Sequence, residues 1–277
     1  MTTIDPEATP DSQARLPGPP LIRLNKAMAD TGYCARRKAD GLIRQGRVQV
    51  NGQTVTTMGM QVNPAIDVIL VDGRPLPRQE KSYLLLNKPV GYVCSRRGGK
   101  TQQTIYALLP EQYKTVDPAG RLDMDSSGLL ILSSDGDFLF HVTHPGFHWA
   151  KRYQVALDRP LSNQDLAQLV AGITLKPENK LAKMADISPL NPLKPRLPAQ
   201  QKAFKQAGAN LYQMTLMTGY NRQIRRTLAI LGYRVLDLHR DAFGPIYLDN
   251  LPEGQVRSLT PEELDAFQPF LKDKTPL

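Results

Sequence analysis

Apolar residues recur at helical spacing in two short segments near the start of the chain. They predict one helix from Leu24 to about Gly32 and a second helix over residues 35–45. Alternating polar and apolar residues then lead into the pair Asn51-Gly52, a strong sequence signal for a β-hairpin. Another strand and turn follow over residues 66–76. The pattern therefore predicts a compact module of two helices and a small sheet.

Beyond residue 81 the pattern changes. Apolar runs of strand length alternate irregularly with short helical patterns, which favours an α+β fold with a mixed, largely antiparallel sheet and flanking helices. A doubly wound parallel sheet would need a more regular alternation. Strands are predicted at residues 84–86, 128–132, 151–157 and 211–217, and helices at residues 105–109, 162–170 and 224–231.

Proline-rich and polar stretches mark the limits of these two parts. The first twenty residues are rich in proline, lack apolar periodicity and predict a disordered tail. A polar linker is predicted near residues 77–81, and a surface connection over residues 190–205. The prediction is a tail over residues 1–20, a first domain over residues 21–77 and a second domain over residues 81–270.

The charge balance adds a preference for a polyanionic partner. Lysine and arginine number 35 against 26 acids, which gives a formal net charge of +9. Cations near phosphates release condensed counterions, so such a protein favours nucleic acid, although a merely soluble basic protein can carry the same charge. The two cysteines lie outside any CxxC spacing, and neither a signal peptide nor an eighteen-residue apolar run is seen. A cytoplasmic protein without a membrane span is expected.

Positive charge is concentrated in the predicted helix pair. The segment from residue 23 to residue 47 has seven cations and only two acids. Most of these cations avoid the apolar face of the second helix, which suits contact with phosphates; the alternative is an ordinary solvated face. The candidate phosphate contacts are Arg23, Lys26, Arg36, Arg37, Lys38, Arg44 and Arg47.

Three segments of this part resemble the S-four RNA-binding domain, a module named after a ribosomal protein. They are residues 23–26 (RLNK), residues 32–40 (GYCARRKAD) and residues 46–52 (GRVQVNG). The resemblance covers residues 21–76 and implies that the seven cations bind RNA. Where the family usually has Ser or Thr, this chain has Ala35, which removes an N-cap side chain worth about 1 kcal/mol.

The segment PAGRLDMDSSGLLIL, residues 118–132, is the most informative part of the second domain. Asp123 and Asp125 lie in a predicted loop beside Arg121 and just before a buried strand, a suitable place for functional carboxylates. Two other interpretations are open. The aspartates can cap the backbone of a turn. An Asp-x-Asp pair can also serve metal or phosphoryl-transfer chemistry, although the residues before Asp123 are not the apolar strand that such hydrolases require.

Five segments in the same order resemble the pseudouridine synthases of the RsuA/RluF type. They are residues 86–91 (LNKPVG), residues 120–130, residues 151–155 (KRYQV), residues 219–226 (GYNRQIRR) and residues 251–260. Together with the S-four segments, the resemblance runs from residue 21 to residue 264. It implies an isomerase that converts uridine to pseudouridine in structured RNA, with no metal or redox cofactor.

The resemblance also implies roles for individual residues. Asp123 takes the position of the catalytic aspartate, which acts at the sugar as a nucleophile on C1′ or as a base. Tyr153 takes the position of the tyrosine that contacts the target base, and Arg225 that of the basic residue paired with the aspartate. Without the family, Tyr153 on an alternating strand suits ordinary packing. The cations near these motifs are further candidates for RNA contact: Lys88, Arg121 and Arg222.

Ribosomal RNA is the substrate that the resemblance implies. Residues 155–160 and 221–226 are nearest to the RluF type, which modifies large-subunit (23S) rRNA and can also act on tRNA. The rival hypothesis is a non-catalytic RNA-binding factor for ribosome assembly. The presence of Asp123, Tyr153 and Arg225 together argues against it. A monomer is expected.

Three histidines have a spacing that could bind zinc from a helix: His141, His144 and His148. Pro145 and Gly146 interrupt that helix, and no cysteine or carboxylate completes a ligand set. The sequence therefore predicts no metal site.

Overall fold

The computed structural model describes residues 21–77, 80–99, 101–190 and 210–267. The chain divides into two compact units, Met1–Glu80 and Lys81–Leu277, and each is described by itself. The predicted tail over residues 1–20 lies outside the described residues. The predicted surface connection over residues 190–205 does too, apart from Leu190.

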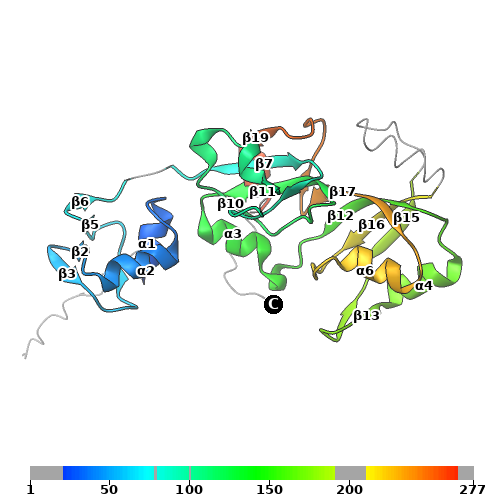
Figure 1. The fold of residues 1–277 in the computed structure, drawn as a ribbon, viewed down its shortest axis with the longest axis horizontal. Helices are drawn as coiled ribbons and strands as arrows, with labels where there is room; N and C mark the ends of the chain where they lie inside the picture. Colours follow the sequence, from blue (N-terminus) through cyan, green and yellow to red (C-terminus); the bar gives the residue numbers. More distant parts are fainter. Residues whose placement is uncertain (1–20, 78–79, 100, 191–209, 268–277) are drawn as a thin grey trace, which may run out of the picture. The chain divides into compact units, whose positions relative to one another are not determined.

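The first unit packs two helices against a small sheet (Figure 1). The helices are α1 (Leu24–Asp30) and α2 (Arg36–Arg44). Ala35 stands at the N-cap of α2 and makes no side-chain capping hydrogen bond, as expected from the missing hydroxyl. The four-stranded sheet has the order β3-β2-β5-β6, and a two-stranded ladder joins β1 to β4. The strands are β1 (Ile22–Arg23), β2 (Val48–Val50), β3 (Gln53–Val55), β4 (Gln61–Val62), β5 (Ile69–Val71) and β6 (Arg74–Pro75).

The second unit is built on a nine-stranded sheet with the order β15-β16-β12-β17-β11-β7-β19, to which β10 and β18 add at the sides. Among its described strands, β11 and β17 pair in parallel and the other pairs are antiparallel. This confirms the predicted α+β fold with a mixed, largely antiparallel sheet. The strands are β7 (Tyr83–Lys88), β10 (Asp117–Pro118), β11 (Ser127–Ser133), β12 (Lys151–Leu157), β15 (Asp186–Pro189), β16 (Leu211–Leu216), β17 (Val235–Phe243), β18 (Ile246–Tyr247) and β19 (Val256–Ser258).

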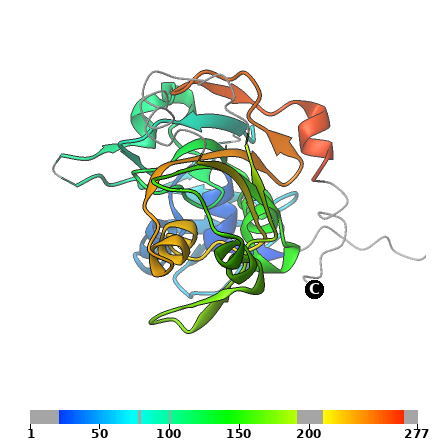
Figure 2. The same cartoon turned by 90° about the vertical axis from the view of Figure 1, so that its right-hand side faces the viewer.

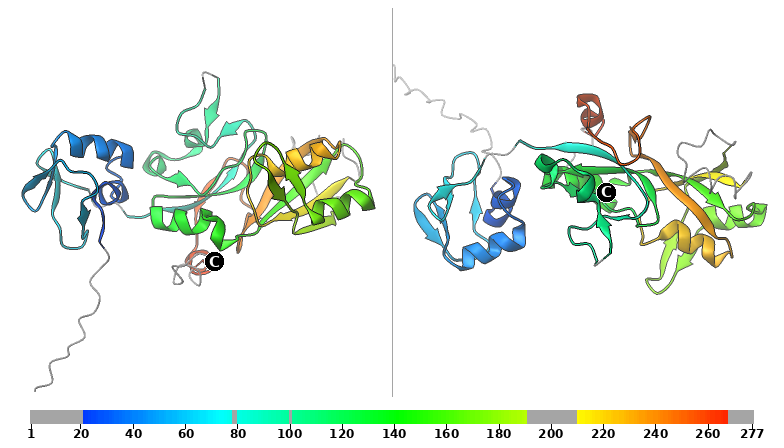
Figure 3. Two further views of the ribbon diagram at one scale, coloured as in Figure 1. Left: turned by 90° about the horizontal axis from the view of Figure 1, so that it is seen from below. Right: turned by 45° about the horizontal axis from the view of Figure 1, so that its top comes forward.

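Helices cover the two halves of this sheet separately. Phe138 and Val142 of α3 (Gly136–Thr143) pack into the core around β7 and β11. On the other half, α4 (Asn163–Ala171) and α6 (Gln223–Ile230) lie side by side on one face of β12, β15 and β16 (Figure 2). Shorter elements complete the unit: η1 (Ile105–Leu108), η2 (Glu111–Tyr113), η3 (Pro145–Phe147), α7 (Pro261–Asp265), the ladder of β13 (Ile173–Leu175) and β14 (Lys180–Ala182), and the ladder of β8 (Tyr92–Val93) and β9 (Gln103–Thr104), which projects from the sheet (Figure 3).

Strand β17 joins the two halves, because it pairs with β11 on one side and with β12 on the other. The sequence did not predict this strand, since its centre contains three consecutive polar residues. Each is buried, and each has a partner on a neighbouring strand: His239 bonds the Ser127 hydroxyl, Arg240 donates to a carbonyl of β11, and Asp241 pairs with Arg152. Burial of polar groups is tolerated where partners are present.

The predicted break of the first strand at residue 87 is also wrong. Strand β7 continues through Asn87 and Lys88, both buried and paired opposite β11. The Asn87 amide donates to the Leu251 carbonyl, so a polar side chain occupies the interior with a partner. The strand therefore delivers Lys88 directly beneath the loop that carries Asp123.

Candidate active site

The loop that carries Asp123 leads into β11. Gly128, near the start of that strand, allows the backbone of β11 to lie close to that of β17. Gly128 lies opposite Arg240 and has a φ of +107°, and an added Cβ would lie 2.2 Å from the Arg240 carbonyl oxygen. Only glycine permits so close an approach of two backbones. Glycine is therefore required at position 128, because it lets the end of the Asp123 loop pack against β17.

Lys88 holds the same loop from below. Its side chain is fully buried, and its ammonium donates to the carbonyl oxygens of Pro89 at 2.9 Å, Asp123 at 3.1 Å and Ser126 at 2.7 Å. Burial lowers the pKa of Lys88 to about 8. The predicted RNA contact of Lys88 is therefore corrected, because a side chain with no exposed surface cannot reach a phosphate. Lys88 positions the loop instead.

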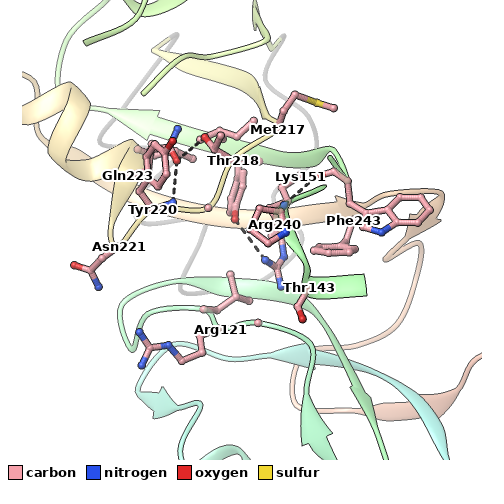
Figure 4. A pocket seen from close by; sticks show the side chains of 18 of the residues that line it. Arg121, Thr143, Lys151, Met217, Thr218, Tyr220, Asn221, Gln223, Arg240 and Phe243 are labelled. Carbon is pink, nitrogen blue, oxygen red and sulfur yellow. Dashed lines mark hydrogen bonds between the residues drawn. The ribbon is translucent and has the colours of Figure 1, made fainter. Parts of the chain in front are cut away.

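Above the loop lies a cavity of about 660 Å³. Its walls come from the Asp123 loop, from the segment of α3 and η3, from β12 and β17, and from the loop before α6 (Figure 4). Asp123 and Tyr153 both line it, so the structure brings together two residues that lie thirty positions apart in the sequence. Arg121 and Arg222 line it as well, both at exposed positions.

The two aspartates of the loop have different partners. Arg222 donates to both carboxylate oxygens of Asp125, at 2.9 and 2.8 Å, whereas its nearest approach to the Asp123 carboxylate is 3.7 Å. Arg222 stands at the N-cap of α6 with a φ of 48°, a backbone conformation uncommon for a residue with a side chain. The hydrogen bonds from Arg222 lower the pKa of Asp125, which keeps that carboxyl ionised.

The predicted ion pair between Arg225 and Asp123 is corrected by this geometry. Arg225 donates to the backbone carbonyls of Asp125 at 2.7 Å and Val235 at 3.2 Å. Its Nε lies 3.3 Å from the Asp125 carboxylate without hydrogen-bond geometry, and within the described part of the chain no ion pair joins it to Asp123. Arg225 therefore ties the loop to β17, and Asp125 rather than Asp123 is its carboxylate neighbour.

Tyr153 approaches from the other half of the sheet. It lies on β12 opposite Arg240, at a register shift between Arg152 and Tyr153. Its hydroxyl is 3.5 Å from Nη1 of Arg240, and its half-buried ring packs against apolar residues from both halves of the sheet. Tyr153 thus forms part of the cavity wall.

Two further cavity residues were not singled out from the sequence. Arg240 is 3% exposed, and Lys151 is half-buried beside it. Burial, and secondarily Arg240, lowers the pKa of Lys151 to about 8. The signal for Lys151 was its place two residues before Tyr153, which puts both side chains on one face of a strand. Arg240 gave no comparable signal, because its strand was not predicted.

The three histidines contact aromatic rings or line the cavity. The rings of His141 and His144 lie 5.2 Å and 6.0 Å from that of Phe147, and His144 and His148 line the cavity. In the described ranges no group of three His, Cys, Asp or Glu side chains is arranged to hold a metal ion. No described helix combines the length and apolar character needed to cross a membrane.

The cavity thus brings together a partly exposed carboxylate, a tyrosine and two exposed arginines, a lining that suits an enzyme acting on a base of RNA. The RNA pseudouridylate synthase family matches residues 82–230, and the S4 domain, the S-four module, matches residues 22–65. The chain belongs to the RNA pseudouridylate synthase family, as the sequence motifs indicated.

Curated relatives cover almost the whole chain. The ribosomal large subunit pseudouridine synthase B of Bacillus subtilis is 35% identical over 88% of this chain and 94% of its own length. The ribosomal small subunit pseudouridine synthase A of Salmonella typhimurium is 35% identical over 88% of this chain and 98% of its own. The dual-specificity RNA pseudouridine synthase RluF of Escherichia coli K12 is 34% identical over 89% of this chain and 79% of its own length. A solved structure of a pseudouridylate synthase is 30% identical, with a TM-score of 0.61 over 89% of this chain and 99% of that one.

Proposed function

We propose that this protein isomerises uridine to pseudouridine in ribosomal RNA, with large-subunit rRNA as the main substrate and tRNA as a second. The placement of Asp123 and Tyr153 in one cavity carries the proposal. At about 660 Å³, the cavity falls within the ordinary range of small-molecule sites and can admit one extruded nucleotide. The relatives act on ribosomal RNA by their names, and they include both large-subunit and small-subunit enzymes.

Each residue has a chemical role in this proposal. The Asp123 carboxylate acts at the sugar, as a nucleophile at C1′ or as a base, when the bond from C1′ to N1 of uracil breaks. Tyr153 contacts the base and keeps the detached uracil in the cavity while it turns to present C5. Arg222 and Arg225 bind Asp125 and so hold the loop in place. A non-catalytic assembly factor would have no use for this arrangement.

The substrate is tested by mapping pseudouridines in total RNA from cells with and without the protein. We expect one or a few sites in large-subunit rRNA to be lost in the deletion and restored by the wild-type gene. Loss of a site only in small-subunit rRNA would correct the substrate. An unchanged map in all RNAs would favour the assembly factor.

We also propose a monomeric, cytoplasmic enzyme. Cys34 and Cys94 are both free, in keeping with a reducing compartment. The cavity is complete within one chain, because all its lining residues belong to the second unit. Light scattering of the purified protein at micromolar concentration, alone and with RNA, tests the monomeric state. Fractionation of cells tests the cytoplasmic location.

The cations of the S4 domain divide into paired and unpaired groups. Lys26 pairs with Asp30 at 2.8 Å, and Arg47 forms two hydrogen bonds with Asp72. Arg36, Arg37, Lys38 and Arg44 on α2, together with Arg23, are exposed and form no ion pair within the described ranges. Cations that no carboxylate neutralises suit phosphate contact.

Changing Arg36, Arg37 and Arg44 together to Gln is expected to weaken RNA binding and its salt dependence. If each contacts one phosphate, the log–log slope of affinity against salt becomes shallower by roughly 2 to 3 units, at about 0.7 to 0.9 per contact. The single-turnover rate at saturating RNA is expected to stay within twofold, because the cavity belongs to the other unit. Binding across a salt series measures the slope. Arg47→Gln is the matched control with a smaller expected effect, and an unchanged slope in the triple variant would make the patch a solvated face.

Arg225→Lys is expected to lower turnover about tenfold or more and to leave RNA binding nearly unchanged. A lysine keeps the charge, but one ammonium cannot reproduce the two guanidinium bonds to the carbonyls of Asp125 and Val235. Single-turnover pseudouridine formation and filter binding separate the two effects. Arg226→Lys, on the same helix but paired with Glu178, is the control. Wild-type turnover in Arg225→Lys would show that this connection to the loop is unimportant.

A further inference from the structure

Two cations, Lys151 and Arg240, stand together on one wall of the cavity. In the pairing of β12 with β17, Lys151 lies opposite Phe243 and Tyr153 lies opposite Arg240. The Lys151 ammonium is 5.1 Å from the centre of the Phe243 ring, and the Arg240 guanidinium is 5.3 Å from the same ring. Figure 4 shows the side chains of Lys151, Arg240 and Phe243 grouped together in the lining of the cavity.

These two cations lack a carboxylate partner, unlike two other arginines in and near the cavity. Arg222 is paired with Asp125, and Arg152 with Asp241. Arg240 donates from Nε to the Leu129 carbonyl, while its buried Nη2 has no hydrogen-bond partner in the described part of the chain. The Lys151 ammonium donates to the Trp149 carbonyl at 2.9 Å. Neither Lys151 nor Arg240 forms an ion pair within the described ranges. Two like charges without a counterion are an electrostatic cost that a bound anion relieves.

The position of the pair indicates which anion it receives. The exposed cations Arg121 and Arg222 lie where a phosphate of the RNA backbone can stay hydrated. Arg240 is 3% exposed, and the wall beside it is formed by the rings of Phe243 and Trp149. A flat, delocalised anion fits such a wall better than a hydrated phosphate. Resting on the proposed function, we propose that Lys151 and Arg240 bind and stabilise the uracil anion released when the C1′–N1 bond breaks.

The electron balance of the reaction requires such an anion. When the C1′–N1 bond breaks, its electron pair leaves with uracil and is shared among N1, O2 and O4, while Asp123 meets the deficit at C1′. After the ring has turned, a C5 electron pair forms the C1′–C5 bond, and the Asp123 carboxylate leaves C1′ with its electron pair. C5 then loses its proton, and N1 gains one. Charge that develops on the oxygens during bond cleavage is stabilised most by donors already in place, as Arg240 and Lys151 are.

The test compares two target nucleosides, uridine and 5-fluorouridine, in otherwise identical RNA. Fluorine withdraws electrons and stabilises the uracil anion by itself, so cleavage then depends less on the protein cations. Lys151→Met is expected to slow single-turnover loss of uridine about 100-fold, as for removal of one anion-stabilising donor. Loss of 5-fluorouridine is expected to slow by about tenfold or less. Arg240→Lys keeps the charge but not the guanidinium. It is also expected to slow the loss of uridine more than the loss of 5-fluorouridine, by a smaller factor than Lys151→Met.

The controls separate a chemical role from a structural one. Arg121→Gln removes an exposed cation of the rim and is expected to affect both nucleosides by the same factor. Thermal unfolding is expected to be unchanged in Lys151→Met, because the change removes a charge that burial disfavours. Equal slowing of both nucleosides in Lys151→Met and Arg240→Lys would overturn the inference while leaving the proposed function intact. A wild-type protein that formed no pseudouridine would overturn both.

Discussion

Asp123→Asn is expected to abolish pseudouridine formation, by at least about 10⁴-fold, while RNA affinity stays within a few-fold. An amide of the same shape can neither attack C1′ nor take a proton from the sugar. The loop itself should keep its structure, because Lys88 binds the backbone carbonyl of Asp123 and not its carboxylate. Single-turnover assays on the mapped RNA and binding at fixed salt measure the two quantities.

Asp125→Asn is the matched control, because it changes the neighbouring carboxylate in the same loop. It weakens the bonds to Arg222 and the approach to Arg225, so a partial loss of turnover is expected. Asp123 retains its chemistry in that variant, and measurable product should remain. If Asp123→Asn formed product at a rate near that of Asp125→Asn, Asp123 would not be the catalytic carboxylate.

Lys88→Met is expected to lower turnover about 100-fold and the free energy of unfolding by about 2 kcal/mol. Methionine fills a similar volume but leaves the carbonyls of Pro89, Asp123 and Ser126 without their shared donor. The loss of stability is partly offset, because the variant no longer has to bury a charge. Burial disfavours the charged form of Lys88 and lowers its pKa to about 8. Chemical denaturation and single-turnover kinetics measure both effects.

Lys114→Met provides the comparison on the surface. Lys114 is exposed and pairs with exposed Glu111 at 2.6 Å, so its loss is expected to change the free energy of unfolding by less than about 0.5 kcal/mol. RNA affinity should be preserved in Lys88→Met, since the side chain has no exposed surface. A large loss of affinity with full turnover would restore Lys88 as an RNA contact and contradict its role in the loop.

The sequence by itself determined the features that depend on neighbours along the chain. The apolar spacing predicted α1, α2, α4 and α6, and alternating or continuous apolar runs predicted β11, β12 and β16. The Asp123 loop was predicted because glycines and a following apolar strand are local signals. The placement of Tyr153 and Lys151 on one face also follows from strand periodicity alone.

Only the tertiary structure decided which charged groups meet. Arg225 was expected beside Asp123, yet Asp125 is its carboxylate neighbour, because the start of α6 presents Arg222 and Arg225 to the same side of the loop. Lys88 looked like a surface cation and is fully buried. Strand β17 carries Arg240 into the cavity although its polar centre has no strand pattern. In each case at least one partner lies far away in the sequence, and folding has to bring it to the buried charge.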